Sequence, residues 1–279
     1  MRYGFVKMQG CGNDYVYIDA FRYDIEDPSS LAVKVSDRHF GIGSDGLILV
    51  APSKVADGRM IMFNLDGSEG RMCGNGIRCV GKFLYDILGI KKDVLTIETK
   101  SGIKTLKMII KNGKATGAVV DMGKAELRPD LIPVNIGGDK VIDHSVNIGG
   151  KDYKITCVSM GNPHAVVFTD DVEDMDLAAI GPGFEKDPIF PESVNTEFVK
   201  VMDPTHLRMR VWERGSGETW ACGTGTCATV VAACLNGYCQ KGTDVRVDLN
   251  GGRLVINYTD ERVLMTGPCE ISFTGEIEV

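Results

Sequence analysis

The chain has 279 residues, of which 43% are apolar and 25% are charged. These fractions are typical of a globular protein, and the length suits one large domain or two domains of moderate size. The formal net charge of −7 argues against a nucleic acid or an anionic membrane as the main partner, because both are themselves negatively charged.

The N-terminal segment and the cysteines indicate the cellular compartment of the protein. The N-terminal segment, residues 1–7, has neither the apolar stretch of a secretion signal nor the pattern of a transit peptide. No apolar run approaches the roughly 20 residues that a membrane helix needs. The nine cysteines are scattered and odd in number, which does not suggest a disulfide framework. We therefore expect a protein of the reducing cytoplasm, in which the thiols serve another purpose.

The first half of the chain predicts short strands, then a glycine-rich turn, one helix and a β-meander. The predicted strands cover residues 15–18, 46–50 and 60–64. After the turn at Cys73, apolar residues from Ile77 to Leu88 form a helical stripe, and Gly89 suits the end of that helix.

The second half predicts the same order of elements. Its strands cover residues 165–169, 196–201 and 207–212, and its glycine-rich turn carries Cys222. The helix that follows, residues 226–235, is apolar on all sides, so we expect it to be buried on all sides.

The common order reflects an internal duplication, because similar segments recur at one offset. Gly12-Asn13 and Gly161-Asn162 are 149 residues apart, as are Cys73-Gly74 and Cys222-Gly223. We therefore predict an α/β (α+β) fold of two similar domains, residues 1–122 and 123–267. Each is expected to wrap a mixed sheet around a central helix, with the active site in the cleft between the domains.

Cys73 and Cys222 each lie where a helix is predicted to begin, followed by Gly-x-Gly. Small residues there leave backbone N–H groups open to a carboxylate. These N–H groups and the helix dipole are expected to lower the pKa of the thiol from its usual value of about 8.5. Each turn can thus bind an anion and activate a thiol.

Two such turns, facing each other across a cleft, suit the inversion of an α-carbon. A thiolate removes a proton from one face, a thiol delivers a proton to the other, and the two exchange roles in the reverse direction. N–H groups aimed at the substrate carboxylate would stabilise the carbanion in a dry, closed site. No lysine motif for a pyridoxal Schiff base is evident, so we expect no cofactor.

Other roles for the cysteines and glycines are weaker. Most remaining cysteines are interpreted as small buried hydrophobic residues, namely Cys79, Cys157, Cys227, Cys234 and Cys269. No Cys-x2-Cys is present and the four histidines are scattered, so no metal site is predicted. The run Gly223–Ala228 matches a dinucleotide fingerprint formally, but no strand leads directly into its glycines.

Seven segments, in order, resemble the diaminopimelate epimerase family over nearly the whole chain. They are Gly12–Asp14, Phe63–Glu69, Met72–Gly76, Met160–His164, Val194–Phe198, Trp212–Gly215 and Ala221–Gly225. The resemblance implies a cofactor-independent isomerase that interconverts LL- and meso-diaminopimelate, on the route to lysine and peptidoglycan. It also implies Cys73 and Cys222 as the acid/base pair, a homodimer, and a C-terminal strand, residues 268–279, that returns to the first domain.

The same resemblance implies roles for the neighbouring residues. N–H groups for the reacting carboxylate would come from Gly74, Asn75, Gly223 and Thr224. The amino groups and the distal carboxylate would be held by Asn13, Asn64, Asn162, Asn195, Glu213 and Arg214. His164 and Glu213 are the positions that the family places close enough to modulate the pKa of the cysteines. Gly46 departs from the family, because some members carry a substrate-contacting Gln there.

Two alternatives stay open. A proline racemase or hydroxyproline epimerase has a similar fold and cysteine pair, but usually has His at the position of Asn75. A non-catalytic amino-acid-binding protein would need the site but not the two thiols.

Overall fold

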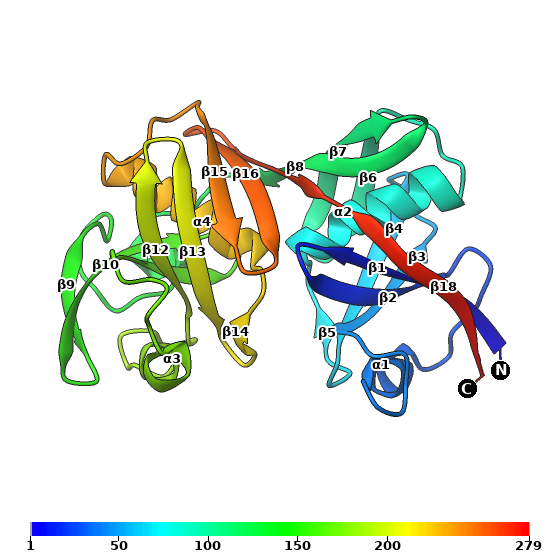
Figure 1. The fold of residues 1–279 in the computed structure, drawn as a ribbon, viewed down its shortest axis with the longest axis horizontal. Helices are drawn as coiled ribbons and strands as arrows, with labels where there is room; N and C mark the ends of the chain where they lie inside the picture. The colour runs from blue at the N-terminus through cyan, green and yellow to red at the C-terminus, as the bar shows by residue number, and fades with distance from the viewer. Residues whose placement is uncertain (1, 279) are drawn as a thin grey trace. The chain divides into compact units, whose positions relative to one another are not determined.

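The computed structural model describes residues 2–278 and divides into two compact units (Figure 1). Unit 1 extends to Asp121 and resumes at Thr266, and unit 2 comprises Met122–Met265. No helix among the described residues is long and apolar enough to cross a membrane.

The elements of unit 1 include two α-helices, the second continued by a π-helical turn. The helices are α1 (Pro28–Ser36), α2 (Gly74–Lys82) and η1 (Phe83–Ile87). The strands are β1 (Arg2–Gly10), β2 (Asn13–Asp19), β3 (Gly46–Ala51), β4 (Gly58–Asn64), β5 (Glu69–Gly70), β6 (Val94–Thr99), β7 (Gly102–Lys111), β8 (Lys114–Gly123) and β18 (Glu270–Glu278).

Unit 2 has a similar set of elements. Its helices are the short 3₁₀ turn η2 (Pro129–Leu131), α3 (Leu177–Glu185) and α4 (Gly223–Leu235). Its strands are β9 (His144–Ile148), β10 (Lys151–Ser159), β11 (Pro163–Phe168), β12 (Asn195–Asp203), β13 (His206–Glu213), β14 (Gly217–Thr219), β15 (Asp244–Leu249), β16 (Gly252–Tyr258) and β17 (Val263–Pro268), of which β17 contains the unit boundary.

The two units repeat the same plan, which confirms the predicted pair of similar mixed α/β domains. The helices α1 and α3 begin 149 residues apart, as do α2 and α4 and also β1 and β10. The strand pairings repeat as well: β1–β2 and β10–β11 are antiparallel, whereas β2–β3 and β11–β12 are parallel. Strand β18 pairs with β1 as β9 pairs with β10, so the C-terminal strand completes unit 1.

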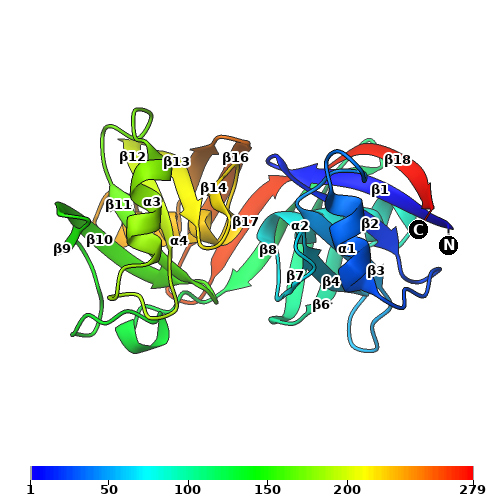
Figure 2. The ribbon, with the colours of Figure 1, turned by 90° about the horizontal axis from the view of Figure 1, so that it is seen from below.

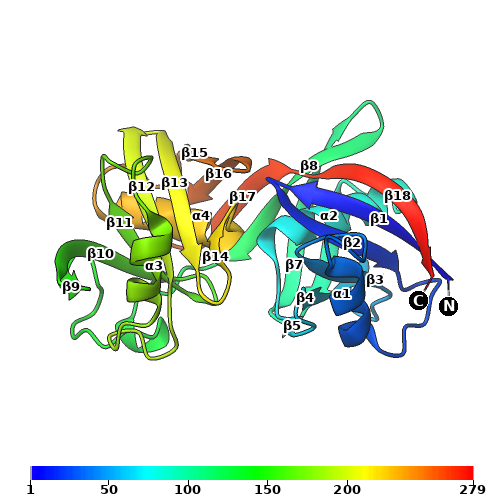
Figure 3. The ribbon, with the colours of Figure 1, turned by 60° about the horizontal axis from the view of Figure 1, so that its bottom comes forward.

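In unit 2 the strands bury both faces, and alternation decides which side chain faces which helix. Ala165, Val167 and Phe198 belong to the core that includes Phe184 of α3. The residues that alternate with these along β11 and β12 point to the other face of the sheet, toward α4. Helix α4 contacts β10, β11, β12, β13 and β16. Ten of the thirteen residues of α4 are buried, as its all-apolar sequence predicted. Figures 2 and 3 show α3 and α4 on opposite faces of β12 and β13.

Unit 1 has the same two-sided arrangement. Val16 and Leu47 join the core that includes Leu31 of α1. On the other face, the Tyr17 hydroxyl donates to the carbonyl of Gly76 in α2 at 3.2 Å. The two units therefore each hold one cysteine-bearing helix, α2 or α4, against the inner face of a mixed sheet.

The prediction of a single helix in each half was wrong, because α1 and α3 are additional. Both are nine residues long and begin at an aspartate cap, where Asp27 accepts from Ser30 N and Asp176 accepts from Ala179 N. Pro182 lies inside α3, so its sequence resembles a loop. The first cysteine-bearing helix also changes to π-helical turn η1 after Lys82, which its apolar stripe does not reveal.

We expect Phe184→Ala to destabilise unit 2 by about 3–5 kcal/mol, because it removes a fully buried ring. The Phe184 ring lies 4.8 Å from the Tyr153 ring and 5.5 Å from the Phe198 ring, centroid to centroid. Urea unfolding measures this loss of free energy. Phe40→Ala is the control, because the Phe40 side chain is 93% exposed, and its effect should stay within about 0.5 kcal/mol.

Candidate functional site

Both cysteines cap the N-terminus of a helix, as the sequence predicted. Cys73 is the N-cap of α2, and its Sγ accepts a hydrogen bond from Gly76 N at 3.3 Å. Cys222 is the N-cap of α4, and its Sγ accepts from Gly225 N at 3.4 Å. An N-cap usually carries an oxygen side chain. In each unit a sulfur therefore lies at the positive end of a helix dipole.

In unit 1 the sulfur of Cys73 faces an oriented amide. Its Sγ donates to Oδ1 of Asn13 at 3.2 Å, and Nδ2 of Asn13 donates to Oδ2 of Asp45 at 2.8 Å. The other oxygen of Asp45 accepts from Arg38 at 3.0 Å. Burial, followed by the nearby Asp14 carboxylate, raises the pKa of Asp45. Asp45 thus fixes which end of the Asn13 amide faces the thiol.

Sequence reasoning missed Asp45 and Arg38. Both lie in the irregular segment before β3, and no motif connects them to Asn13. Only the pairing of β2 with β3 brings this segment beside Asn13.

The first turn of α2 is tied down by a buried arginine. Arg78 is fully buried, and its guanidinium donates to the carbonyl of Gly74 at 2.9 Å, to Oδ1 of Asn75 at 3.1 Å and to the carbonyl of Pro268 at 3.0 Å. The side chain of Asn75 is therefore engaged within unit 1. What Gly74 and Asn75 can offer a ligand is the backbone of the helix N-terminus.

Asn64 and Gly46 lie opposite each other in the β3–β4 pair. Asn64 is exposed at the end of β4, and its Nδ2 donates to Oγ of Ser68 at 3.0 Å. A Cβ at Gly46 would collide with the carbonyl oxygen of Phe63 and lie 2.8 Å from the Tyr15 ring. A Gln at this position therefore does not fit the backbone of this chain.

In unit 2 the sulfur of Cys222 is buried near negative charge. Burial, followed by the carboxylates of Glu213 and Glu197, raises the pKa of Cys222 well above its usual value. The hydroxyl of Thr224, 3.5 Å from Sγ, and the N–H of Gly225 act in the opposite direction. The expectation of a lowered pKa was therefore wrong for Cys222, because desolvation and two carboxylates outweigh the helix N-terminus. Burial and the nearby carboxylates thus favour the thiol form of Cys222 over the thiolate.

His164 lies between two groups of the same unit. Its Nδ1 is 2.7 Å from Oε1 of Glu197, and its Nε2 is 3.1 Å from Oδ1 of Asn162. Nδ2 of Asn162 donates to Oγ1 of Thr224 at 3.3 Å. A continuous series of hydrogen bonds therefore links His164 to the Cys222 turn. Sequence reasoning missed Glu197, although an acidic residue directly before Phe198 and Val199 in a predicted strand was a usable signal.

Asn195 organises the turn that follows β13. Its Oδ1 accepts from Arg214 N at 3.0 Å, and its Nδ2 donates to the carbonyl of Pro163 at 3.1 Å. The guanidinium of Arg214 donates to the carbonyl of Glu192 at 2.7 Å. Oε1 of Glu213 accepts from the Thr219 hydroxyl at 2.5 Å. These contacts tie the turn that carries Glu213 and Arg214 to β11 and β14.

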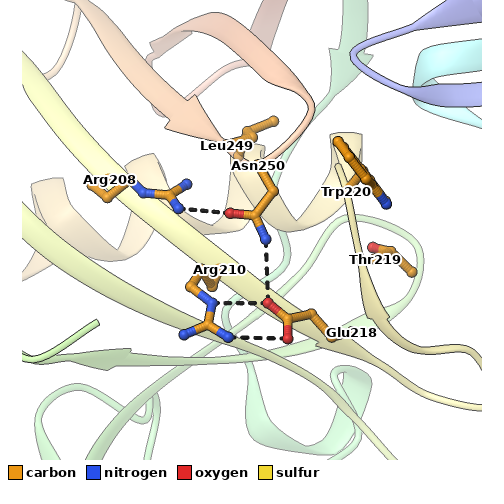
Figure 4. A pocket seen from close by; sticks show the side chains of 7 residues that line it. All are labelled: Arg208, Arg210, Glu218, Thr219, Trp220, Leu249 and Asn250. Carbon is orange, nitrogen blue, oxygen red and sulfur yellow. Dashed lines mark hydrogen bonds and ion pairs between the residues drawn. The ribbon is translucent and has the colours of Figure 1, made fainter. Parts of the chain in front are cut away.

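Unit 2 also has an open cavity of about 680 Å³ beside β14 (Figure 4). Arg210 and Glu218 form a two-bond ion pair in its wall, at 2.8 and 3.0 Å, and Nδ2 of Asn250 donates to Glu218 at 3.2 Å. Cys222 does not line this cavity. The ion pair anchors β14, which leads directly into the Cys222 turn.

The other seven cysteines are mostly buried, and none of the nine forms a disulfide. The side chains of Cys79, Cys157, Cys227 and Cys269 are buried, as expected, whereas Cys234 is only partly buried. Cys11 and Cys239 are also buried. Within residues 2–278, no group of three or more His, Cys, Asp or Glu side chains could hold a metal ion.

Comparison with known proteins gives matches over nearly the whole chain. The family model described as diaminopimelate epimerase matches residues 5–128 and 156–272. A diaminopimelate epimerase from Desulfovibrio desulfuricans is 54% identical over 98% of this chain and 97% of its own length. Another from Acetivibrio thermocellus is 52% identical over 99% of this chain and 98% of its own.

The fold also resembles solved structures at low identity. A hydroxyproline epimerase from Agrobacterium vitis, solved with bound trans-4-hydroxy-L-proline, matches with a TM-score of 0.69 at 13% identity, over 99% of this chain and 91% of that one. A likeness at this identity shows a shared fold and no more.

We expect Glu213→Gln to speed alkylation of Cys222 at neutral pH. The variant removes a negative charge that raises the pKa of Cys222, so the pKa falls and the thiolate fraction rises about tenfold for each unit of decrease. The measurement is the rate of iodoacetamide labelling of the Cys222 peptide as a function of pH, by mass spectrometry. Glu261→Gln, an exposed charge change, should leave the rate unchanged. A slower reaction in Glu213→Gln would contradict the assigned cause.

Proposed function

Because this chain belongs to the diaminopimelate epimerase family and is therefore an isomerase, we propose that it interconverts LL- and meso-diaminopimelate without a cofactor. The observation that carries the proposal is the pair of cysteines at equivalent helix N-caps, Cys73 and Cys222, in two duplicated units. We further propose that the enzyme acts in the cytoplasm as a homodimer and supplies lysine and peptidoglycan precursors.

The proposed chemistry uses the two sulfurs as one acid and one base. A thiolate takes the α-proton from one face of the carbon and becomes a thiol. The second thiol gives its proton to the opposite face and becomes a thiolate, so protons and charge balance without any oxidant. The reaction in the other direction exchanges the two roles. No other group needs to change its protonation state over a full turnover.

The helix N-termini would stabilise the carbanion between these two steps. Backbone N–H groups of Gly74 and Asn75 at α2, and of Gly223 and Thr224 at α4, would hydrogen-bond the substrate carboxylate. Such preorganised donors are most effective where negative charge develops and water is excluded. This explains why both caps are followed by small or short residues.

The raised pKa of Cys222 indicates that this cysteine starts the reaction as a thiol. It also gives Glu213 a second role, in controlling that pKa. Cys222 begins as a thiol because burial and the carboxylates near it disfavour the thiolate. A cationic substrate amino group beside Glu213 would offset that negative charge. The Cys222 thiolate would therefore be easier to form in the enzyme–substrate complex than in the free enzyme. His164, linked through Asn162 and Thr224, would act on the same sulfur.

The remaining polar side chains would recognise the rest of the substrate. Diaminopimelate carries two amino-acid heads, so it needs donors and acceptors for a second ammonium and a second carboxylate. We assign this to Asn13, Asn64, Asn162, Asn195, Glu213 and Arg214. A proline ring has no second head, and the likeness to a hydroxyproline epimerase at 13% identity supports a common fold alone.

Incubation of the reduced protein with LL-diaminopimelate in D2O tests the proposed function. We expect the meso isomer to form with deuterium at the inverted carbon, because the delivered proton comes from a thiol that exchanges with solvent. Mass spectrometry and chiral chromatography measure this. Turnover of proline in place of diaminopimelate would favour the racemase alternative, and binding without turnover would favour a non-catalytic protein.

Single-cysteine variants test the two-base mechanism. Cys73→Ala and Cys222→Ala should each abolish epimerisation, because no proton carrier remains on one face. The remaining cysteine can still remove and return a proton on its own face. Each variant should therefore exchange the α-hydrogen of one epimer for deuterium without inverting it, and the preferred epimer should reverse between the variants. If both variants exchange the same epimer, the pair does not act as proposed.

Arg214→Lys tests recognition of the distal carboxylate. A planar guanidinium can form two parallel bonds to a carboxylate, whereas an ammonium cannot. Loss of one charge-assisted bond is worth about 1.5–3 kcal/mol, so kcat/KM should fall at least about tenfold. Steady-state kinetics provide the measurement, with Arg262→Lys on an exposed turn as the control. An unchanged value would remove Arg214 from substrate recognition.

A further inference from the structure

Glu197 is a carboxylate buried in strand β12. It is 0% exposed, as are Thr196 and Phe198 on either side of it in β12. Its Oε1 is 2.7 Å from Nδ1 of His164, and its Oε2 has no hydrogen-bond partner among the described residues. Burying a carboxylate is costly unless it is paired. The contact with His164 is therefore the interaction that can compensate for its burial.

The partners of the His164 ring define where its protons lie. Oδ1 of Asn162 can only accept, so Nε2 of His164, 3.1 Å away, must carry a hydrogen. Nδ1 faces a carboxylate oxygen, so a second proton lies between Nδ1 and Oε1 of Glu197. Whichever of the two atoms holds that proton, the pair His164 and Glu197 is neutral as a whole. The carboxylate charge of Glu197 by itself raises the pKa of Cys222, and in the pair the His164 ring balances that charge.

This arrangement gives the hydrogen bonds one direction toward the sulfur. Nε2 of His164 donates to Asn162, which leaves Nδ2 of Asn162 to donate to Oγ1 of Thr224 at 3.3 Å. Because that oxygen accepts from Asn162, the Thr224 hydroxyl hydrogen can point to Sγ of Cys222, 3.5 Å away. A hydrogen bond donated to sulfur favours the thiolate.

We propose that Glu197 is a positioning residue, which holds Nε2 of His164 as a donor and so orients Asn162 and Thr224 toward Cys222. The proposal rests on the proposed function, because it assigns Glu197 a part in controlling the Cys222 proton. It goes beyond that function because Glu197 forms no hydrogen bond with the Cys222 turn itself and acts on the cysteine only through His164, Asn162 and Thr224.

The surroundings of Glu197 show that the structure makes room for it. A Cβ at Gly225 would collide with Oε1 of Glu197 and lie 3.2 Å from Sγ of Cys222. The glycine thus lets the Glu197 side chain lie close to the first turn of α4. Gly225 therefore has two roles: its N–H caps the Cys222 sulfur, and its lack of a side chain leaves space for the Glu197 carboxylate.

The groups that face Glu197 come from four elements. They are His164 on β11, Glu213 on β13, Cys222 at the start of α4 and Cys157 on β10. Burial raises the pKa of Glu197, while His164 opposes this rise. Burial, then Glu197, raises the pKa of Cys157 to about 12. His164 is thus the one group in this set that favours the Glu197 carboxylate.

Two variants of Glu197 distinguish a positioning role from a direct effect of its negative charge on Cys222. Glu197→Met keeps the length of the side chain but cannot hydrogen-bond the ring, so either ring nitrogen can lose its proton. Glu197→Gln can still bond the ring but does not fix which nitrogen is protonated. Thr196→Val is the control, because it removes a buried hydroxyl from the same strand on the opposite face. Circular dichroism and thermal unfolding establish that each variant is folded.

The pH dependence of Cys222 alkylation without substrate distinguishes the two roles, because they shift it in opposite directions. If Glu197 acts by positioning, Glu197→Met should move the pH at which iodoacetamide labels Cys222 upward. The thiolate then loses a hydrogen-bond donor, while the net charge at positions 164 and 197 stays zero because His164 becomes a neutral imidazole. If Glu197 acts only as a negative charge, the variant should move that pH downward, as Glu213→Gln does. A downward shift therefore overturns the proposal. Glu197→Gln should lie between Glu197→Met and the wild type.

Two further measurements complete the test. In the substrate-free wild type, proton NMR should show a resonance far downfield of the amides from the proton between His164 and Glu197, absent in both Glu197 variants. With diaminopimelate, kcat of Glu197→Met should fall about tenfold to a hundredfold, by a larger factor than any rise in KM. An unchanged kcat overturns the proposal, and so does a missing resonance in the wild type. If the wild type does not turn over diaminopimelate, the proposed function fails while the labelling and NMR results still decide the role of Glu197.

Discussion

The hydrogen bond from a glycine N–H to a cysteine sulfur at a helix N-cap is the interaction on which the cysteine turn of each unit depends. Gly76 supplies it to Cys73, and Gly225 supplies it to Cys222. The bond requires the cap residue to leave the helix in an extended conformation. This conformation presents the sulfur beside the N–H groups of the first turn, which have no partner within the helix itself. Anion binding and thiol placement therefore follow from one piece of backbone geometry, used twice.

The rest of each unit holds that geometry in place by different means. In unit 1 the buried guanidinium of Arg78 bridges the first turn of α2 to the carbonyl of Pro268. In unit 2 the Arg210–Glu218 ion pair anchors the strand that leads into Cys222. A helix against the inner face of a sheet is common to both, but the polar contacts that position it have diverged since the duplication.

The surroundings of the two sulfurs have diverged further. Cys73 donates to a neutral amide, Asn13, whose orientation Asp45 maintains. Burial and then the carboxylate of Glu213 raise the pKa of Cys222. In the proposed reaction, the two cysteines would therefore carry out symmetric chemistry from unequal starting states. One unit provides a thiol whose protonation depends on nearby carboxylates, and the other provides a thiol that faces an amide.

The sequence alone determined the duplication, three strands of each half and the two helix-start cysteines, because each leaves a local mark such as a repeated offset, an apolar period or a Gly-x-Gly turn. It did not reveal α1 and α3, whose nine residues are too short and irregular to show a period. Nor did it reveal Asp45 or Glu197, or the raised pKa of Cys222. Those depend on which strands pair and on how deeply a group is buried. Such facts exist only once residues distant in the chain are brought together, since desolvation and through-space charge have no sequence period.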